Sequence, residues 1–344
     1  MVDTVDPSGS AVCFDRDPWM PIAGRARSHP LRCRKTRRLG TGARCDALPG
    51  QDLRPYIDGS TYRDCGGNPS RRRTPMSKTR IVVGVDGSEQ AESAIGWAAA
   101  EAASTGGSLH LIHAFVWPQF RVPLGPSAFA PGLRAAADQI AETALELAHK
   151  LQPDLTAASS VVDGFPLPVL ADESHEADLL VIGSREVGSV LSVLVGSTGV
   201  GLAAYARCPV VIVRSEQPDL VGNYVVIGYD GSPPSVAAFR FGREYARRHG
   251  LTVRVVSVQR PGAAEHEAVP ADQLAALTHL VPDGPPVEIT QVVGHPAEQL
   301  LRLSADAQLV VVGSRGHGGF TGLLLGSVSQ AVLHHADCPV CIVH

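Results

Sequence analysis

The chain has 344 residues, 44% hydrophobic and 19% charged, which is enough apolar sequence to bury the cores of two or three domains. It contains no run of about 18 apolar residues and no charged-then-apolar N-terminal order, so neither a membrane span nor export is indicated. We therefore expect a cytoplasmic, globular protein without membrane partners.

The net charge of −4 hides an uneven distribution. Residues 1–75 carry 14 Lys and Arg against 8 Asp, whereas residues 76–344 carry 16 Lys and Arg against 26 Asp and Glu. Modules that bind nucleic acid normally present a basic face. The acidic balance of the larger part therefore argues against a nucleic-acid partner.

The first 75 residues differ from the rest of the chain in composition. They hold four of the seven cysteines and many Arg, Pro and Gly, without sustained apolar periodicity, so the segment is predicted to be disordered. Two interpretations stay open. The clusters at 32–38 and 71–73 are typical of a basic arm, whereas Met76, just before the first apolar strand, indicates a start codon assigned too far upstream. The four cysteines, Cys13, Cys33, Cys45 and Cys65, lack the close pairs of a zinc site.

Residues 76–344 contain two copies of one unit. Three motifs recur in order, at offsets of 144, 130 and 130 residues: IVVGVDGS at 81–88 and VVIGYDGS at 225–232, LLVIGSR at 179–185 and LVVVGSR at 309–315, CPVVIV at 208–213 and CPVCIV at 338–343. A tandem duplication explains them. The predicted domains are 76–215 and 222–344.

Each copy alternates short β-branched runs with helical segments. The apolar runs are continuous, as expected for strands covered on both faces of a parallel sheet. In the second copy we predict strands at 224–229, 252–258, 287–293, 308–312 and 339–343, and helices at 233–249, 270–280, 296–305 and 327–336. Ser88 and Ser232 suit N-caps. Five strands joined by four crossover helices predict a doubly wound α/β domain.

A candidate nucleotide site follows from the loops after the strands. In doubly wound sheets, ligands bind beyond the carboxyl ends of the strands. The second copy has the spacing Gly313-x2-Gly316-x9-Gly326-Ser327, in which Gly326 and Ser327 open a helix whose N–H groups suit phosphate. Gly313 and Gly316 would remove Cβ atoms that block ribose or phosphate, and a positive φ is expected at Gly316.

Other residues of the second copy complete this candidate site. Asp230 can accept from a ribose hydroxyl or hold a phosphate-bound Mg²⁺. Val256 could line an adenine pocket and lend it backbone hydrogen bonds. Arg315 suits either phosphate pairing or a surface salt bridge. Gly231 and Ser232 complete the Asp-Gly-Ser turn, which could equally be an ordinary strand-to-helix connection.

The order of these motifs, found twice, resembles the tandem members of the universal stress protein family. The resemblance covers residues 79–344. It implies the strand order 3-2-1-4-5 in each domain, ATP bound through G-x2-G-x9-G-(S/T), and pairing through the last strand, either within the chain or in a homodimer. It also implies a role in the stress response.

The first copy departs from the motif at one position, where Glu186 replaces the second glycine. A Cβ at a position that needs positive φ costs about 1–3 kcal/mol, and a carboxylate repels phosphate. We therefore expect weaker binding by the first domain. Its candidate residues are Asp86, Gly87, Ser88, Gly183, Arg185, Gly196 and Ser197.

Two further features have plain structural explanations. Cys338 and Cys341 are three apart on a predicted strand, so their side chains should lie on opposite faces, buried, rather than form a redox or metal pair. His317 is expected to be a solvated loop residue.

Three functions remain open for the chain. The favoured one is a regulatory protein that binds ATP without turning it over, because no GxxxxGK[ST] loop, lysine among the glycines or general base is evident. The alternatives are a slow ATPase or phosphotransferase, and a structural dimerisation protein with vestigial pockets.

Overall fold

The computed structural model describes residues 78–117, 130–184, 195–214, 222–262, 268–280, 284–317 and 324–344. All of them belong to one compact unit, Pro69–His344. The predicted disordered segment and its four cysteines lie outside the described residues, as do Arg185 and Glu186. None of the described helices is long and apolar enough to cross a membrane.

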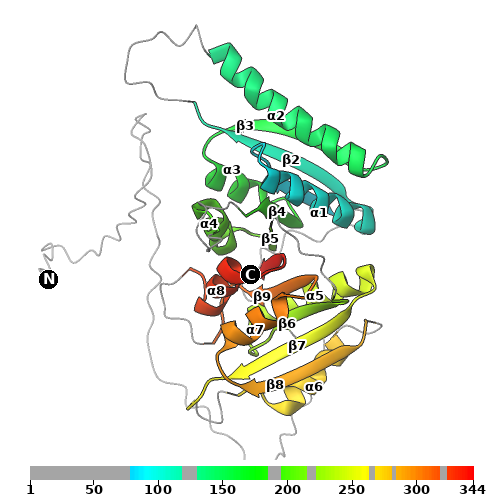
Figure 1. Cartoon of the computed structure of the whole chain (residues 1–344), viewed down its shortest axis with the longest axis vertical. Coiled ribbons are helices and arrows are strands. Elements are labelled where there is room, and N and C mark those ends of the chain that lie inside the picture. The colour runs from blue at the N-terminus through cyan, green and yellow to red at the C-terminus, as the bar shows by residue number, and fades with distance from the viewer. Residues whose placement is uncertain are drawn as a thin grey trace, which may run out of the picture. The chain divides into compact units, whose positions relative to one another are not determined.

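The first domain alternates strands and helices along the chain (Figure 1). Its elements are β1 (Arg80–Gly84), α1 (Glu89–Thr105), β2 (Ser108–Phe115), α2 (Ala130–Leu151), β3 (Thr156–Asp163), α3 (Pro166–Glu173), β4 (Leu179–Gly183), α4 (Ser197–Tyr205) and β5 (Val210–Val213). The strands are parallel in the order β3-β2-β1-β4-β5, the order that the family resemblance implies.

The second domain repeats this plan. Its elements are β6 (Tyr224–Gly228), α5 (Pro233–His249), β7 (Thr252–Gln259), α6 (Ala271–Leu280), β8 (Val287–Val293), α7 (Pro296–Ser304), β9 (Leu309–Gly313), α8 (Ser327–His335) and β10 (Val340–Val343). Every end lies within one residue of the predicted one, because buried Val and Ile runs mark the strands and Ser, Gly and Pro mark the helix starts.

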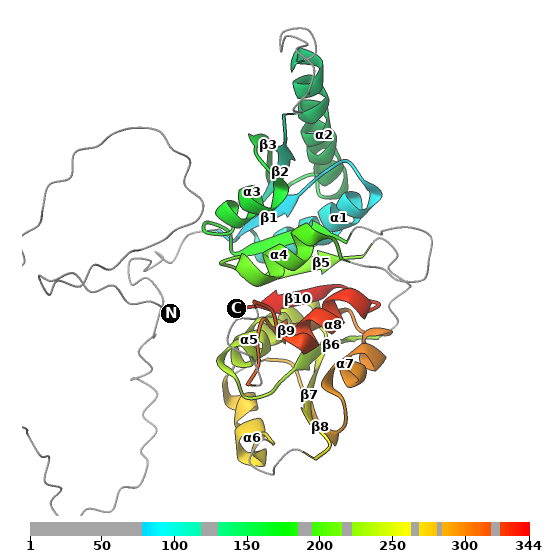
Figure 2. The same cartoon turned by 90° about the vertical axis from the view of Figure 1, so that its left-hand side faces the viewer.

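The two domains share one ten-stranded sheet, which the prediction of two five-stranded sheets did not state. Its order is β3-β2-β1-β4-β5-β10-β9-β6-β7-β8, and β5 and β10 pair antiparallel, with Val211 opposite Cys341 (Figure 2). Because of this reversal, the carboxyl ends of the second domain's strands lie on the same side as the amino ends of the first domain's strands.

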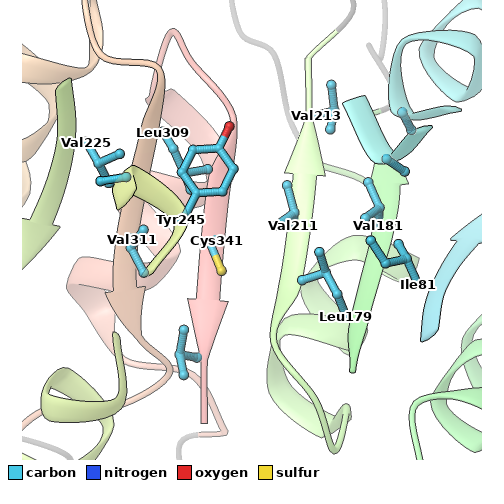
Figure 3. Packing of buried hydrophobic residues seen from close by; sticks show 14 of the residues in the cluster. Ile81, Leu179, Val181, Val211, Val213, Val225, Tyr245, Leu309, Val311 and Cys341 are labelled. Carbon is cyan, nitrogen blue, oxygen red and sulfur yellow. The ribbon is translucent and has the colours of Figure 1, made fainter. Parts of the chain in front are cut away.

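Two apolar layers cover the sheet. Alternate strand residues pack against α1, α2, α5 and α6 on one face and against α3, α4, α7 and α8 on the other. Figure 3 shows part of the first layer, which includes Val211 and Cys341. Cys338 belongs to the other layer, so the prediction that the two cysteines are buried on opposite faces is confirmed. Burial raises the pKa of Cys338 to about 12, as expected of an unreactive thiol.

Side chains bind the domains together on both faces of the joint between β5 and β10. On one face, Trp97 stacks on Tyr245 at 5.8 Å between ring centroids, and the buried Glu101 accepts from Arg248 at 2.5 Å and His249 at 2.7 Å. Other contacts lie on the α4 and α8 side. There the Arg214 guanidinium donates to the Leu333 carbonyl at 3.1 Å, and the Val195 N–H donates to His334 Nδ1 at 3.2 Å.

Candidate functional site

The Asp-Gly-Ser turn of the second domain is held by its own hydrogen bonds. Gly231 adopts a φ of 83°, which favours glycine. Asp230 Oδ1 accepts from the Ser232 N–H at 3.0 Å and from its hydroxyl at 2.6 Å, and Ser232 caps α5 by accepting from Ser235 N–H. One oxygen of Asp230 thus serves the turn, as the plainer interpretation of this motif expects.

The first domain has the same turn. Gly87 has a φ of 79°, and Asp86 Oδ1 accepts from the Ser88 N–H at 3.2 Å and from its hydroxyl at 2.5 Å. Ser88 caps α1, as predicted. The two turns are therefore equivalent in backbone and in capping.

The turn after β6 contacts the loop after β9, as the topology predicts. Asp230 Oδ2 accepts from the His317 N–H at 3.1 Å, and the Ser232 hydroxyl lies 3.4 Å from the Arg315 carbonyl. A Cβ at Gly316 would overlap the Asp230 carboxylate. Gly316 does not have a positive φ, so that expectation is wrong; the glycine is needed because Asp230 occupies the space of a side chain.

Gly313 and Gly183 make room for helices. A Cβ at Gly313 would lie 2.7 Å from Pro234 Cβ and 3.0 Å from Ser235 N, and one at Gly183 would overlap the backbone of Gln90. The first turns of α5 and α1 therefore pack directly on the ends of β9 and β4. This packing accounts for both glycines without a ligand.

Among the described residues, the N-terminus of α8 is the part of the motif that protein contacts leave open. Gly326 is the N-cap, with no side-chain cap, and its N–H donates to the Ser314 carbonyl at 2.8 Å. A Cβ there would meet its nearest atoms at 3.4–3.5 Å, which is ordinary van der Waals contact. Ser327 is exposed. An uncapped first turn presents N–H groups and a partial positive charge to solvent.

The α4 helix of the first domain begins in the same way. Gly196 is its N-cap without a side-chain hydrogen bond, and Ser197 is exposed. Both domains thus pair a serine-capped helix after the first strand with a glycine-capped helix after the fourth.

Arg315 and Val256 have structural contacts of their own. Arg315 is exposed, and its Nε donates to the Leu324 carbonyl at 3.3 Å, across the loop that leads to α8. Val256 is 3% exposed, packs in the layer with Leu300 and Val312, and its carbonyl accepts from Tyr229 N–H at 3.0 Å. That carbonyl is therefore already paired within the sheet.

Sequence reasoning missed Gln273, which lies beside the turn. Its amide donates to the Tyr229 hydroxyl at 3.2 Å, and Gln273 and the exposed His317 come within 3.3 and 3.5 Å of a Cβ built on Gly231. In the first domain Ile140 occupies the corresponding place beside Gly87. Because Gln273 comes from α6, no local signal marks it. The second site is therefore more polar here than the first.

The described residues offer no metal centre of their own. No group of three or more His, Cys, Asp and Glu is placed to hold an ion in the described ranges. Asp230 Oδ1 accepts two hydrogen bonds and Oδ2 one, so a single oxygen keeps a lone pair for a ligand. This donor set suits a ribose hydroxyl better than a bare Mg²⁺, which prefers octahedral oxygen coordination.

The fold and these loops define a class: a tandem doubly wound α/β protein with an open helix N-terminus beyond the fourth strand of each domain. The family model of the "Universal stress protein family" matches residues 78–214 and 223–344. A universal stress protein of Mycobacterium tuberculosis is 36% identical over 295 residues, covering 78% of this chain and 99% of that protein. The chain belongs to the universal stress protein family.

A solved structure of low sequence identity shows the same fold. A universal stress protein from Archaeoglobus fulgidus is similar with a TM-score of 0.64 at 17% identity, covering 77% of this chain and 97% of that one. Another solved universal stress protein, described as in complex with cAMP, is 25% identical and covers 41% of this chain and 100% of its own, with a TM-score of 0.33.

Proposed function

We propose that this chain is a regulatory nucleotide-binding protein of the stress response, which holds ATP mainly in its second domain and does not depend on turning it over. The proposal rests on one observation above all. Gly326 has room for a Cβ, so its own protein contacts do not require glycine, whereas those of Gly313 and Gly316 do. Glycine is also a favoured N-cap residue, and a ligand that approaches the backbone closely is the further reason that we propose for it at the tip of α8.

The other candidate residues follow one another along the edge of the sheet in an order that fits a nucleotide. Asp230, with one free lone pair, lies at the end of β6, where it suits a ribose hydroxyl. Next to β6 is β9, followed by Arg315, and next to β9 is β10. The exposed Ser327 hydroxyl and the N–H groups of α8 suit the phosphates.

The second domain is proposed as the dominant site because of two differences in the first. In the first domain Ile140 occupies the place that Gln273 has in the second domain, so the first site lacks this polar group beside its turn. Glu186 stands where Gly316 stands, and a carboxylate near a polyphosphate repels it. Neither difference affects α4 itself, so the first domain keeps its helix N-terminus but binds more weakly.

The test is to identify what the protein carries when purified. Native protein is denatured, and the released small molecules are separated by anion exchange with mass detection. We expect an adenine nucleotide at close to one equivalent per chain, with ATP the main species. Release of no nucleotide, together with no ATP binding by the refolded protein, would favour a structural dimerisation protein with vestigial pockets.

A kinetic measurement separates binding from turnover. We expect phosphate release from ATP slower than about one turnover per minute, unaffected by Asp230→Ala except through binding. Faster release that disappears in Asp230→Ala at saturating ATP would make the protein an ATPase or phosphotransferase and overturn the regulatory assignment.

A further inference from the structure

The turn between α4 and β5 of the first domain lies beside the end of β10, the last strand of the second domain. Because β5 and β10 run antiparallel with Val210 opposite Ile342, the end of β10 lies beside the residues that precede β5, among them Arg207. Figure 2 shows β5 and β10 side by side, with the chain's C-terminus at the end of β10. An element of one domain thus borders the loops of the other.

Short contacts continue from this edge to the tip of α8. The Ser314 N–H donates to the Val343 carbonyl at 2.6 Å, and the Gly326 N–H donates to the Ser314 carbonyl at 2.8 Å. The strand order β6-β9-β10-β5 therefore places four groups in sequence along one edge: Asp230, Arg315, His344 and Arg207. A ligand with its sugar at Asp230 and its phosphates at α8 points its far end toward Arg207.

Two of these four groups, Arg315 and Arg207, are guanidiniums, whereas Asp230 at the other end of the row is a carboxylate. Arg207 and Arg315 are both exposed. Burial lowers the pKa of His344, and the two guanidiniums, Arg207 first, lower it further. Both guanidiniums thus act on His344, as expected from the strand order, which places His344 between them.

The equivalent position near the first site carries the opposite charge. Arg207 N–H donates to Ser174 Oγ at 2.9 Å, and Asp337 N–H donates to Ser304 Oγ at 3.1 Å, so the two residues occupy matching places in the two copies. By the symmetry of the β5–β10 pair, Asp337 borders the first site as Arg207 borders the second. The second site gains a positive charge where the first gains a negative one.

We propose that Arg207, supplied by the first domain, is a specificity-determining residue of the second domain's site and makes it prefer a nucleoside polyphosphate to a monophosphate. This inference rests on the proposed nucleotide binding. A longer phosphate chain carries more charge and extends further toward Arg207, so the guanidinium stabilises ATP more than AMP. Arg207 also makes the second domain's site depend on the first domain, so the second domain alone would lack this guanidinium.

The test compares two nucleotides in full-length protein freed of bound nucleotide. Isothermal titration with ATP and with AMP is carried out for the wild type, Arg207→Gln and Arg207→Lys. Arg207→Gln should weaken ATP about threefold to tenfold and AMP by less than about twofold, with a larger effect at low salt. Arg207→Lys keeps the charge and should retain most of the preference, and it tests the idea even if the glutamine variant folds poorly.

Arg240→Gln is the matched control, because it removes the same charge from an exposed site two turns along α5. It should leave both affinities unchanged. An unchanged ratio of ATP to AMP affinity in Arg207→Gln, or an equal loss of both nucleotides, would overturn the role of Arg207 while leaving the proposed function intact. A wild type that binds neither nucleotide would overturn both.

Discussion

At the scale of single residues, the three glycines of the second motif have three different physical causes. Gly313 admits the first turn of α5, Gly316 admits the Asp230 carboxylate, and Gly326 meets only ordinary contacts. The motif treats the three glycines as equivalent, but Gly313 serves helix packing, Gly316 serves loop closure and Gly326 lies at an open helix end. The first domain replaces the middle one by Glu186, the position at which the second domain closes its loop onto Asp230.

Gly316→Ala should destabilise the second domain, whereas Gly326→Ala should not. The new Cβ at Gly316 displaces Asp230, which then loses the hydrogen bond from His317. The free energy of unfolding should fall by about 1–2 kcal/mol. At Gly326 the Cβ makes ordinary contacts, so the change should stay below about 0.5 kcal/mol. Urea unfolding measures both. Adding Asp230→Ala should remove most of the extra cost of Gly316→Ala; simple additivity would show that the two residues do not compete for space.

At the scale of elements, helices that begin beyond a strand differ in how their first turns are satisfied. Ser88 and Ser232 cap α1 and α5, and prolines open α3 and α7, whereas α4 and α8 begin at glycine without a side-chain cap. Of these two, α8 also reaches across to the first domain. Val195, which donates to His334, directly precedes Gly196, so α8 contacts the loop that opens α4.

The contact at His334 predicts a pH dependence of stability. Burial, followed by the charges of His335 and Arg214, lowers the pKa of His334, and its Nδ1 needs a lone pair to accept from Val195. The unfolded chain therefore takes up this proton at a higher pH than the folded chain. The contribution of His334 to the free energy of unfolding should be fully present above about pH 6.5. It should be lost progressively as the pH falls below that value.

Unfolding of wild type and His334→Asn at about pH 7.5 and about pH 5.5 checks this dependence. The Asn oxygen can still accept from Val195 and does not titrate, so the drop in stability should be smaller in the variant. His279→Asn, at an exposed position of α6, is the control and should behave as the wild type does. Equal drops in wild type and His334→Asn would mean that the pKa of His334 does not differ between the folded and unfolded states.

At the scale of the whole molecule, the pairing that could have formed a homodimer is made within the chain. Both last strands, β5 and β10, are used in the ten-stranded sheet, and the paired Trp97 and Tyr245 and the buried Glu101 strengthen the same joint. Glu101 is 3% exposed and accepts hydrogen bonds from Arg248 and His249 on α5. A buried carboxylate of this kind is costly to leave half paired.

Glu101→Gln should lower the free energy of unfolding by about 3 kcal/mol, because it removes the buried carboxylate and leaves the charge of Arg248 balanced only by the more exposed Glu244. Glu244→Gln is the control on the same arginine; Glu244 is 41% exposed, so its loss should cost less than about 1 kcal/mol. Urea unfolding of both variants gives the comparison. Similar costs for the two would mean that the buried pair contributes no more than a surface one.

The fold was largely predictable from the sequence because its signals are local. Runs such as Leu309–Gly313 are buried on both faces, and Ser232 with Pro233 marks a helix start, so the ends of the second domain's elements are predicted to within one residue. The joint between β5 and β10 was foreseen only as a pairing of last strands, with the partner left open. Which partner is used depends on contacts such as Glu101 with Arg248, which are far apart in sequence.

The candidate site was predictable in outline and not in detail. The spacing of Gly313, Gly316 and Gly326 located the loops, and the Asp230 turn faces them as expected. The cause of each glycine depends on what surrounds the missing Cβ. The space is taken by α5 at Gly313 and by Asp230 at Gly316, whereas at Gly326 the nearest described atoms lie at ordinary contact distance. Gln273 reaches the turn from α6, and Arg207, which we propose for the site, comes from the other domain, so no spacing rule could identify them.

The most direct measurement is the affinity of ATP for Gly326→Ala compared with Gly196→Ala. Gly326→Ala keeps the contacts that the described residues make but puts a methyl group where we propose that the phosphates approach α8, so ATP should bind at least about tenfold more weakly. Gly196→Ala, at the matching N-cap of α4, should change the tight ATP binding by less than about twofold. Equal ATP affinities for the two variants would contradict a dominant site at the N-terminus of α8.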